Sequence, residues 1–328
     1  MAAAIETGVS LRTFNTFGVE ARAAYFASVR DVGQLRAALA DPRVVDLPRL
    51  ILGGGSNILF TRDFDGLVVK VDIPGYARIG DDGDRWLVRV GAGESWHGTV
   101  VRLLADGLPG LENLALIPGS VGGAPIQNIG AYGLELAERL QYVEVFDPAR
   151  GELDSLDVAA CRFGYRDSVF KHERASGRIV VGVTLALPKV WTAVAGYADV
   201  EHQLRARGIA RPSARDLFDA VVAIRQRKLP DPAQVGNAGS FFKNPVVPRA
   251  QREELIDRFP SLVSYDIGGG RFKLAAGWLI EACGLKGAVR GCAGVSPRQA
   301  LVLVNLGGAT GLEILALARE VQDTVRAR

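Results

Sequence analysis

Apolar residues fall along the chain in two kinds of spacing, and each kind predicts a different element. An almost unbroken apolar run over 179–187 predicts a strand with both faces buried. Shorter apolar runs predict further strands over 48–52, 66–71, 86–90, 142–146 and 300–304. Apolar residues at helical spacing predict four helices that begin after the capping residues Asp31, Ser95, Ser213 and Thr310. The mixture predicts a chain of class α+β.

The remaining stretches divide the chain. Further helices are expected over 249–258 and 273–282, and a helical turn over 154–160. The stretch 189–212 is polar and irregular, carries Tyr197, and is interpreted as an excursion or a domain linker. A chain of 328 residues is long enough for two or three domains.

Two uncharged glycine-rich stretches, 52–60 and 117–133, carry the clearest functional signal. The second has five glycines in the fifteen residues 119–133. Backbone N–H groups without a neighbouring Cβ can form a nest for an anion such as a diphosphate. Either loop alone could equally be a tight structural turn. Two such loops about sixty residues apart favour a dinucleotide cofactor.

The composition narrows the class of protein. A formal charge of +3, without a block of Lys or Arg, argues against nucleic acid as a partner. Three Cys indicate a reducing compartment, and with only three His a metal site is not expected. No run of 18 apolar residues is present, so no membrane association is expected. We therefore expect a cytoplasmic protein, and a monomer.

Candidate side chains for chemistry are few, and each has a structural alternative. Arg166 lies in a turn, where its guanidinium could bind a carboxylate or pair with Asp167. Ser240 lies in a small-residue turn over 236–245, where its hydroxyl could bond only its own backbone. Nothing fits Gly-x-Gly-x-x-Gly, a P-loop or the Gly-x-Ser-x-Gly elbow of a hydrolase.

Taken in order, several segments resemble the type I subgroup of the UDP-N-acetylenolpyruvoylglucosamine reductase family. They are 52–60, 90–97, 109–133, 161–171, 228–232, 236–245 and 273–280. The resemblance implies an α+β fold, with a two-part FAD-binding region of the vanillyl-alcohol-oxidase type followed by a substrate domain. It implies FAD-binding subdomains at 1–75 and 76–212, the latter with the Tyr-bearing excursion 188–212, and a substrate-binding domain at 213–328.

The resemblance also implies a reaction of peptidoglycan precursor synthesis. NADPH reduces FAD, and the reduced flavin passes hydride to the enolpyruvyl group of a UDP-sugar, giving UDP-N-acetylmuramate. Arg166 would stabilise the resulting enolate, and Ser240 would donate the proton. The FAD contacts implied are Gly53, Gly54, Gly55, Ser56, Asn57, Pro118, Gly119, Ser120, Gly122, Gly123, Asn128, Gly130 and Tyr132. The substrate contacts implied are Tyr197, Arg225, Lys228, Asn244 and Lys273.

Two further features of the sequence bear on FAD binding and on turnover, and the second is a departure from the family pattern. The segment 45–70 has no His or Cys, so FAD is expected to bind without a covalent bond. The family's third catalytic residue is a Glu beyond the last helix, and the sequence ends at Arg328 before it. One alternative is therefore a catalytically impaired form that binds FAD or the UDP-sugar. Another is a flavin oxidase of the same fold, which a substrate assay would distinguish.

Overall fold

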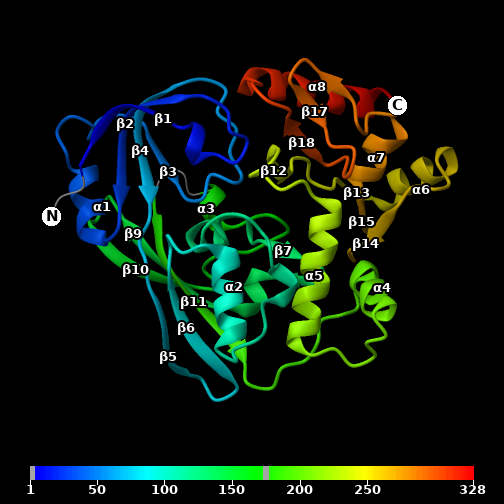
Figure 1. Ribbon diagram of the computed structural model, residues 1–328, viewed down its shortest axis with the longest axis horizontal. Helices are drawn as coiled ribbons and strands as arrows, with labels where there is room; N and C mark the ends of the chain where they lie inside the picture. The colour runs from blue at the N-terminus through cyan, green and yellow to red at the C-terminus, as the bar shows by residue number, and fades with distance from the viewer. Residues whose placement is uncertain (1–3, 173–176) are drawn as a thin grey trace. The chain divides into compact units, whose positions relative to one another are not determined.

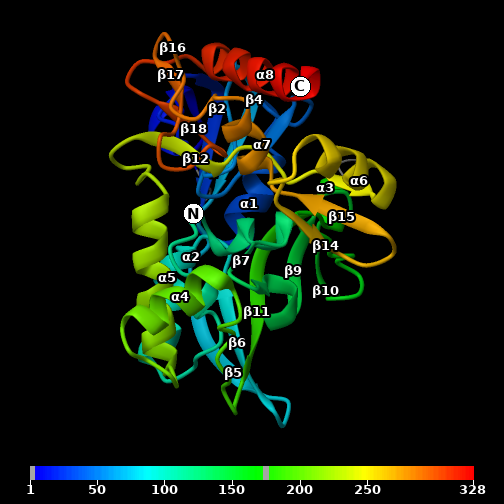
Figure 2. The ribbon, with the colours of Figure 1, turned by 90° about the vertical axis from the view of Figure 1, so that its right-hand side faces the viewer.

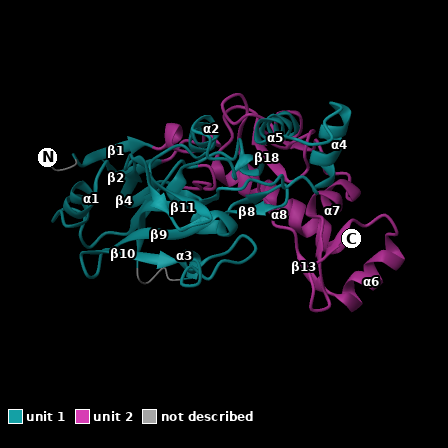
Figure 3. Cartoon of the chain, turned by 90° about the horizontal axis from the view of Figure 1, so that it is seen from below, with its two compact units in different colours: residues 1–10, 22–55, 63–225 teal, residues 11–21, 56–62, 226–328 magenta. Residues whose placement is uncertain are grey.

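The computed structural model describes residues 4–172 and 177–328, and the chain folds into two compact units (Figures 1 and 3). Unit 1 comprises residues 1–10, 22–55 and 63–225. Unit 2 comprises residues 11–21, 56–62 and 226–328. Each unit is thus assembled from separate stretches of chain. The predicted boundaries at 75/76 and 212/213 stay predictions.

The first sheet of unit 1 contains parallel pairs. In spatial order its strands are β1 (Glu6–Ser10), β2 (Arg22–Val29), β4 (Phe64–Val71) and β3 (Arg49–Leu52). β4 pairs in parallel with both β2 and β3, while β1 pairs antiparallel with β2. Helix α1 (Val32–Leu39) begins at Asp31, whose carboxylate accepts the Gln34 N–H at 2.7 Å. β3 leads directly into the first glycine loop, so the sheet fixes where that loop starts.

The second sheet of unit 1 is antiparallel throughout (Figure 1). Its order is β10 (Glu152–Asp157), β9 (Leu140–Asp147), β11 (Ile179–Pro188), β6 (Arg85–Gly91) and β5 (Tyr76–Asp81). The first nine residues of β11 are all buried, which confirms the expectation from its apolar run. Both sheets contribute to one hydrophobic core.

Helices and short turns complete unit 1. The other α-helices are α2 (Trp96–Ala105), α3 (Val169–His172), α4 (Ala198–Ala206) and α5 (Ala214–Lys228), of which the last three residues of α5 belong to unit 2. The pair β7 (Gly130–Ala131) and β8 (Leu134–Glu135) lies at the end of the second glycine stretch and just beyond it. Short 3-10 turns are η2 (Glu112–Leu114), η3 (Val121–Gly123), η4 (Pro125–Gln127) and η5 (Leu136–Arg139). The Ser95 hydroxyl caps α2 as predicted, because it accepts the Gly98 N–H at 3.2 Å.

Unit 2 has two small sheets. The order of the first is β12 (Gly236–Ser240), β18 (Val302–Asn305), β17 (Ala293–Val295) and β16 (Val289–Arg290), and α8 (Gly311–Ala327) packs on β17 and β18 (Figure 2). The order of the second is β13 (Val246–Pro248), β15 (Arg271–Leu274) and β14 (Ser264–Asp266), with α6 (Arg249–Arg258) beside it. Helix α7 (Ala276–Ala282) follows β15, and η1 (Arg12–Phe14) lies in the N-terminal piece.

The early piece of unit 2 is joined to residues far along the chain. Asn237 donates its N–H to the Thr16 carbonyl at 3.0 Å, and the Asn305 side-chain amide donates to the Phe17 carbonyl at 2.9 Å. Gly236 allows this approach, since a Cβ there would lie 2.2 Å from the Phe17 oxygen. The piece 11–21 is therefore part of the C-terminal unit.

Several local expectations are wrong. The stretch 154–160 begins as strand β10, because residues 152–157 pair with β9. The excursion 189–212 contains helix α4, and the supposed turn 236–245 begins as strand β12. The predicted helix over 273–282 starts only at Ala276, because Lys273 belongs to β15. The class α+β itself is confirmed.

Candidate cofactor and substrate site

The two glycine loops meet within unit 1, backbone against backbone. A Cβ added to Gly54 would lie 2.6 Å from the Gly119 Cα, and one added to Gly53 would lie 2.5 Å from the Ser120 Oγ. At Gly54 no side chain larger than hydrogen fits without movement of the backbone, and at Gly53 the Ser120 side chain would have to move. The sequence predicts two loops of similar character, and the structure brings 53–54 and 119–120 together.

The second loop is fixed by the strand and helix before it. Val121 donates its N–H to the Glu94 carbonyl at 2.9 Å, and Gly122 donates to the Ala92 carbonyl at 2.9 Å. Gly122 is required by packing, since a Cβ there would lie 2.7 Å from the Ala92 Cβ. These contacts hold the second loop against the residues that connect β6 to α2.

The paired loops open onto a cavity of about 930 Å³ in unit 1, a volume in the range of cofactor pockets. The glycine side of the cavity is formed by Gly53, Ser120, Gly122 and Gly123. Its other walls are formed by Leu47, Arg49, Leu50, Ile51, Val71, Ala92, Ile126, Pro148, Ala149, Phe170, Gly177, Arg178, Ile179 and Val180. Polar backbone thus faces a mostly apolar enclosure with two cationic residues.

Ser120 provides a test of whether these residues fit a phosphate-bearing cofactor. Its Oγ is buried and makes no hydrogen bond within the described residues. A buried hydroxyl without a partner is costly, and a phosphate oxygen in the adjoining cavity would accept its hydrogen. Together with glycines at which a Cβ would fill the space, this residue fits the diphosphate of FAD.

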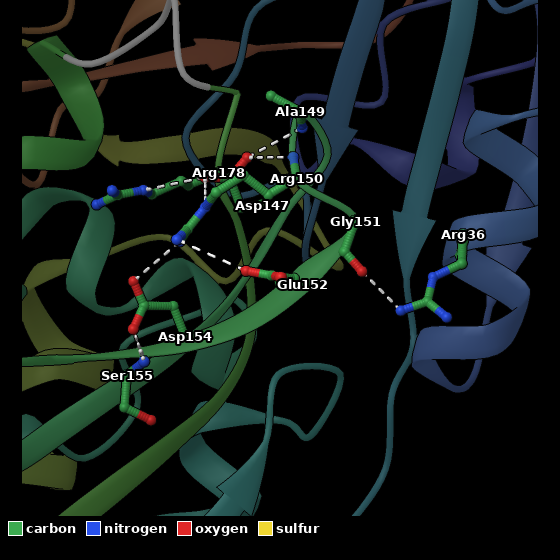
Figure 4. Close-up of polar contacts among 9 residues, drawn as sticks. All are labelled: Arg36, Asp147, Ala149, Arg150, Gly151, Glu152, Asp154, Ser155 and Arg178. Carbon is green, nitrogen blue, oxygen red and sulfur yellow. Dashed lines mark hydrogen bonds and ion pairs between the residues drawn. The ribbon is translucent and has the colours of Figure 1, made fainter.

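The wall formed by Pro148 and Ala149 is held by an ionic cluster (Figure 4). The Asp147 carboxylate accepts the backbone N–H of Ala149 at 2.9 Å and the Arg150 Nε–H at 3.1 Å. Burial acts to raise the pKa of Asp147, but the hydrogen bonds from Arg150 and Ala149 lower it below its ordinary value. The Arg178 Nε lies 3.9 Å from the same carboxylate. Asp147 therefore fixes both the turn and one cationic residue of the wall.

Arg36 ties helix α1 to this turn. Its guanidinium donates to the Gly151 carbonyl at 2.7 Å (Figure 4). It also lies 5.7 Å from the centroid of the Phe146 ring. These contacts link helix α1 to β9 and to the turn that follows it.

Arg166 lies against the second part of the long glycine stretch. Its backbone is left-handed, with φ of 54°, and its Nη1 donates to the Asn128 carbonyl at 3.3 Å. Its Nη2 donates to the Gly130 carbonyl. Asp167 instead pairs with His172, with Oδ2 2.8 Å from the ring Nε2. The structure thus places Arg166 at the predicted cofactor loop and joins its neighbour to another partner.

Asn128 and Tyr132 have structural contacts of their own. The Asn128 amide donates to the Glu135 carboxylate at 2.7 Å, and its Oδ1 accepts the Ala137 N–H at 3.0 Å. The Tyr132 ring meets the Tyr197 ring edge to face, with 5.3 Å between centroids. Asn113, which the sequence did not single out, donates to the carbonyls of Tyr132 and Val194 at 2.8 Å each. Asn113 therefore ties the excursion to the glycine stretch.

Arg225 joins this group from α5. Burial lowers the pKa of Arg225, and the neighbouring Tyr132 hydroxyl opposes that change. The Arg225 Nε is buried and has no hydrogen-bond partner within the described residues. A buried guanidinium of this kind is suited to an anionic ligand. Unit 1 therefore groups three of the predicted ligand contacts, Tyr132, Tyr197 and Arg225.

Unit 2 carries the remaining predicted residues. Ser240 is exposed at the end of β12, opposite Val302. Asn244 has a structural contact, because its Oδ1 accepts the Ala276 N–H at 2.9 Å where α7 begins. Lys273 lies in β15, with its Nζ 5.8 Å from the centroid of the Tyr265 ring. Lys228 is the last residue of α5, and Ser56 and Asn57 follow Gly55, whose φ is 62°.

Sequence reasoning missed Arg49 and Arg178 in the cavity wall. Arg178 stands directly before the apolar run of β11 and Arg49 begins β3, so both residues lie where a strand starts. A search for charged residues at the ends of the predicted strands would have found them.

Other kinds of site find no support in the described parts of the chain. Residues 4–172 and 177–328 contain no group of three or more His, Cys, Asp or Glu placed to hold a metal ion. The three Cys are free thiols, and burial raises the pKa of Cys161 to about 12, which leaves it protonated and inert. None of the described helices is long and apolar enough to cross a membrane.

Comparison with known proteins identifies two parts of the chain. Residues 23–157 match the model of an FAD binding domain, and residues 231–328 match the C-terminal domain of UDP-N-acetylenolpyruvoylglucosamine reductase. The reductase of Ralstonia nicotianae is 56% identical over 317 residues, which is 96% of this chain and 93% of that protein. That of Burkholderia mallei is 56% identical over 321 residues, covering 97% and 92%.

A solved structure shows the same fold over the full length. The crystal structure of the reductase from Thermus caldophilus superimposes with a TM-score of 0.71 at 27% identity, covering 98% of this chain and 95% of that one. The family models, the relatives and the solved structure all indicate the same family. The chain therefore belongs to the UDP-N-acetylenolpyruvoylglucosamine reductase family of FAD-dependent oxidoreductases.

Proposed function

We propose that the protein reduces the enolpyruvyl group of UDP-N-acetylglucosamine enolpyruvate with electrons from NADPH, giving UDP-N-acetylmuramate for peptidoglycan precursor synthesis. It acts as a cytoplasmic monomer on this small-molecule substrate. The observation that carries the proposal is the pair of glycine loops, with 53–54 packed on 119–120 beside the cavity of about 930 Å³. The names of the relatives support the choice of substrate.

The two paired glycine loops and Ser120 form a cradle that holds FAD without a covalent bond. The glycine loops offer backbone N–H groups, and the buried Ser120 hydroxyl offers a further donor to the diphosphate. Gly55, Ser56, Asn57, Pro118 and Tyr132 extend the predicted contacts at either end of the two loops. Bound there, FAD would supply the chemistry of hydride transfer from NADPH to the substrate alkene.

Arg166 stabilises the charge that develops on the substrate. Hydride addition to the terminal carbon of the alkene leaves an enolate spread onto the carboxylate, and a guanidinium fork matches that group. The donor bonds from Arg166 to the carbonyls of Asn128 and Gly130 hold its side chain in one orientation. A fixed cation is more effective than a mobile one, because it needs no reorganisation when charge appears.

Ser240 donates the proton to the other carbon of the enolate. A serine hydroxyl is a weak acid, but an enolate of this kind is a strong enough base to accept its proton. Tyr197 closes over the substrate, and Arg225, Lys228, Asn244 and Lys273 hold its diphosphate and sugar. Asn244 retains its side-chain amide for this task, since only its Oδ1 is used by Ala276.

Stopped-flow absorbance of the flavin, without oxygen, tests this proposal by separating the two half-reactions. In the Ser240→Ala variant, reduction of the flavin by NADPH should keep its rate, because that step needs no proton at the substrate carbon. Reoxidation by UDP-N-acetylglucosamine enolpyruvate should slow ~100-fold or more, the effect of losing a positioned acid. Ser261→Ala, at an exposed position without an assigned role, should behave as the natural protein.

Two results would overturn the proposal. If the enolpyruvyl sugar did not reoxidise the reduced natural protein, the substrate would be wrong. If Ser240→Ala blocked reduction by NADPH and spared reoxidation, the role of Ser240 would be wrong.

A further inference from the structure

The first two residues of α2 hold the start of the second glycine loop. Trp96 donates its backbone N–H to the Gly119 carbonyl at 3.0 Å and its Nε1–H to the Leu114 carbonyl at 2.9 Å. Between these two contacts, Leu116 donates its N–H to the Nδ1 of His97 at 3.1 Å. The loop is thus anchored at three successive points before it reaches the cavity.

Leu116 is the anchored residue that needs the most support. Its φ is 55°, a left-handed conformation that is rare for a branched apolar side chain. Such a conformation costs free energy and persists only where the surroundings hold it. The hydrogen bond to His97 is the contact that fixes its N–H, and three residues later the chain packs on Gly54.

The geometry of this bond assigns the protonation state of His97. A backbone N–H can only donate, so Nδ1 must carry a lone pair and the ring proton must lie on Nε2. The neutral ring lies flat on the Phe218 ring, with 5.9 Å between centroids and 9° between planes. Its position at the N-terminus of α2 and the facing cation Arg225 on α5 both oppose a positive charge.

We propose that His97 is a positioning residue of the FAD cradle, which as a neutral hydrogen-bond acceptor keeps Leu116 left-handed and so sets 119–120 against 53–54. The proposal rests on the cradle assigned above. A second proton on the His97 ring would convert Nδ1 from acceptor to donor. The Nδ1–H and the Leu116 N–H would then point toward each other, and the second glycine loop would lose this anchor. FAD affinity should therefore depend on pH through this one side chain.

The direction of the pH effect follows from the acceptor role. FAD binding needs the fixed loop, and hence the neutral ring, so affinity is complete where His97 is neutral and falls as the pH drops and the ring takes up a proton. Burial, and then the charge of Arg225, lowers the pKa of His97 below its ordinary value of 6.5. The loss should accordingly appear below pH 6.5 and be absent at pH 8.

Titration of the apoprotein with FAD, followed by flavin fluorescence between pH 5 and pH 8, tests the proposal with two variants. His97→Asn places Oδ1 near the position of Nδ1 and does not titrate, so it should bind FAD within about 3-fold of the natural protein at pH 8 and keep that affinity at pH 5. His97→Phe keeps a ring on Phe218 and loses the acceptor. It should bind about 10-fold more weakly at every pH, as expected when a partly buried N–H loses its partner.

The exposed His202 on α4 provides the matched control. His202→Asn should keep both the affinity and the acid loss of the natural protein. Acid loss in His97→Asn equal to that of the natural protein would overturn the proposal, as would natural affinity in His97→Phe at pH 8. Failure of the natural protein to bind FAD would instead contradict the cradle itself, so the two failures can be told apart.

Discussion

Arg166 combines a disfavoured backbone with a specific set of contacts. Its φ of 54° lies where few residues other than glycine are found, and its guanidinium donates to two carbonyls of the glycine stretch. Residues in such conformations gather at functional sites, where the surrounding structure holds them. The two bonds to the glycine stretch distinguish Arg166 from Arg162, whose backbone is also left-handed.

Replacement of Arg166 by Lys should lower turnover more than FAD content. The ammonium keeps the charge but cannot reproduce the planar fork against a carboxylate, so the rate of substrate reduction should fall ~100-fold or more. Steady-state rates and the flavin-to-protein absorbance ratio measure the two quantities. Arg162→Lys is a suitable comparison, because Arg162 is also left-handed, with φ of 46°, and has no assigned role. Normal turnover of Arg166→Lys with full FAD would refute the role given to Arg166.

At the scale of elements, predictions from the sequence were correct where a structure depends only on residues close together in the chain. The caps Asp31, Ser95 and Thr310 were found from sequence because each side chain bonds a backbone N–H only three residues away. Strand β10 was missed because it exists through its pairing with β9, as in Leu156 opposite Val143, and polar residues such as Asp154 give it no local strand signal.

The site, too, has features that are visible in the local sequence and features that depend on the fold. The glycine loops were visible from composition, but the contact of Gly54 with Gly119 depends on the fold of two separate stretches. Helix α4 was missed although Val200 and Leu204, four residues apart, are both buried. That signal was present and was masked by the glycines on either side.

Substitution of Gly54 by Ala should separate the two loops. The new Cβ would lie 2.6 Å from the Gly119 Cα and 2.9 Å from its carbonyl carbon, so backbone must move. We expect most of the bound FAD to be lost on purification, and stability to fall by about 1–3 kcal/mol. Gly196→Ala, where a Cβ meets nothing within 4 Å and φ is not left-handed, should retain FAD. Equal FAD content in the two variants would contradict the packing argument.

Replacement of Thr310 by Ala should destabilise unit 2 through α8. The Thr310 hydroxyl accepts the Glu313 N–H at 3.2 Å, and the Glu313 carboxylate accepts the Thr310 N–H at 2.7 Å. Loss of such a capping box costs about 1 kcal/mol in the free energy of unfolding, measured by urea denaturation. Thr324→Ala on the same helix removes only a bond to the Glu320 carbonyl and should cost less. A larger cost at Thr324 would show that the cap is not what stabilises the helix.

At the scale of the whole molecule, the cavity beside the glycine loops belongs to unit 1, while the predicted proton donor Ser240 belongs to unit 2. The described residues that line the cavity include no His or Cys, the side chains that commonly form a covalent bond to a flavin. The cofactor should therefore be held by shape and hydrogen bonds alone.

Acid precipitation of the purified protein should release the flavin into the supernatant. Absorbance of both fractions measures the outcome, and free FAD carried through the same treatment shows that the cofactor survives it. Yellow colour that stays with the washed pellet would show a covalent bond, and the account of the cavity would have to change.

The patchwork of unit 2 has a consequence for synthesis of the protein. Asn305, which donates a hydrogen bond to the Phe17 carbonyl, is 288 residues further along the chain. At the usual speed of a ribosome, synthesis of those residues takes roughly 15–60 s. During most of translation the segment 11–21, with its aromatic residues, lacks the residues from 226–328 on which it packs in unit 2. Because an early apolar segment packs only after the end of the chain has been synthesised, chaperones have a long interval in which to bind it. The yield of folded protein in a cell should therefore depend on chaperones more than the stability of the folded protein would suggest.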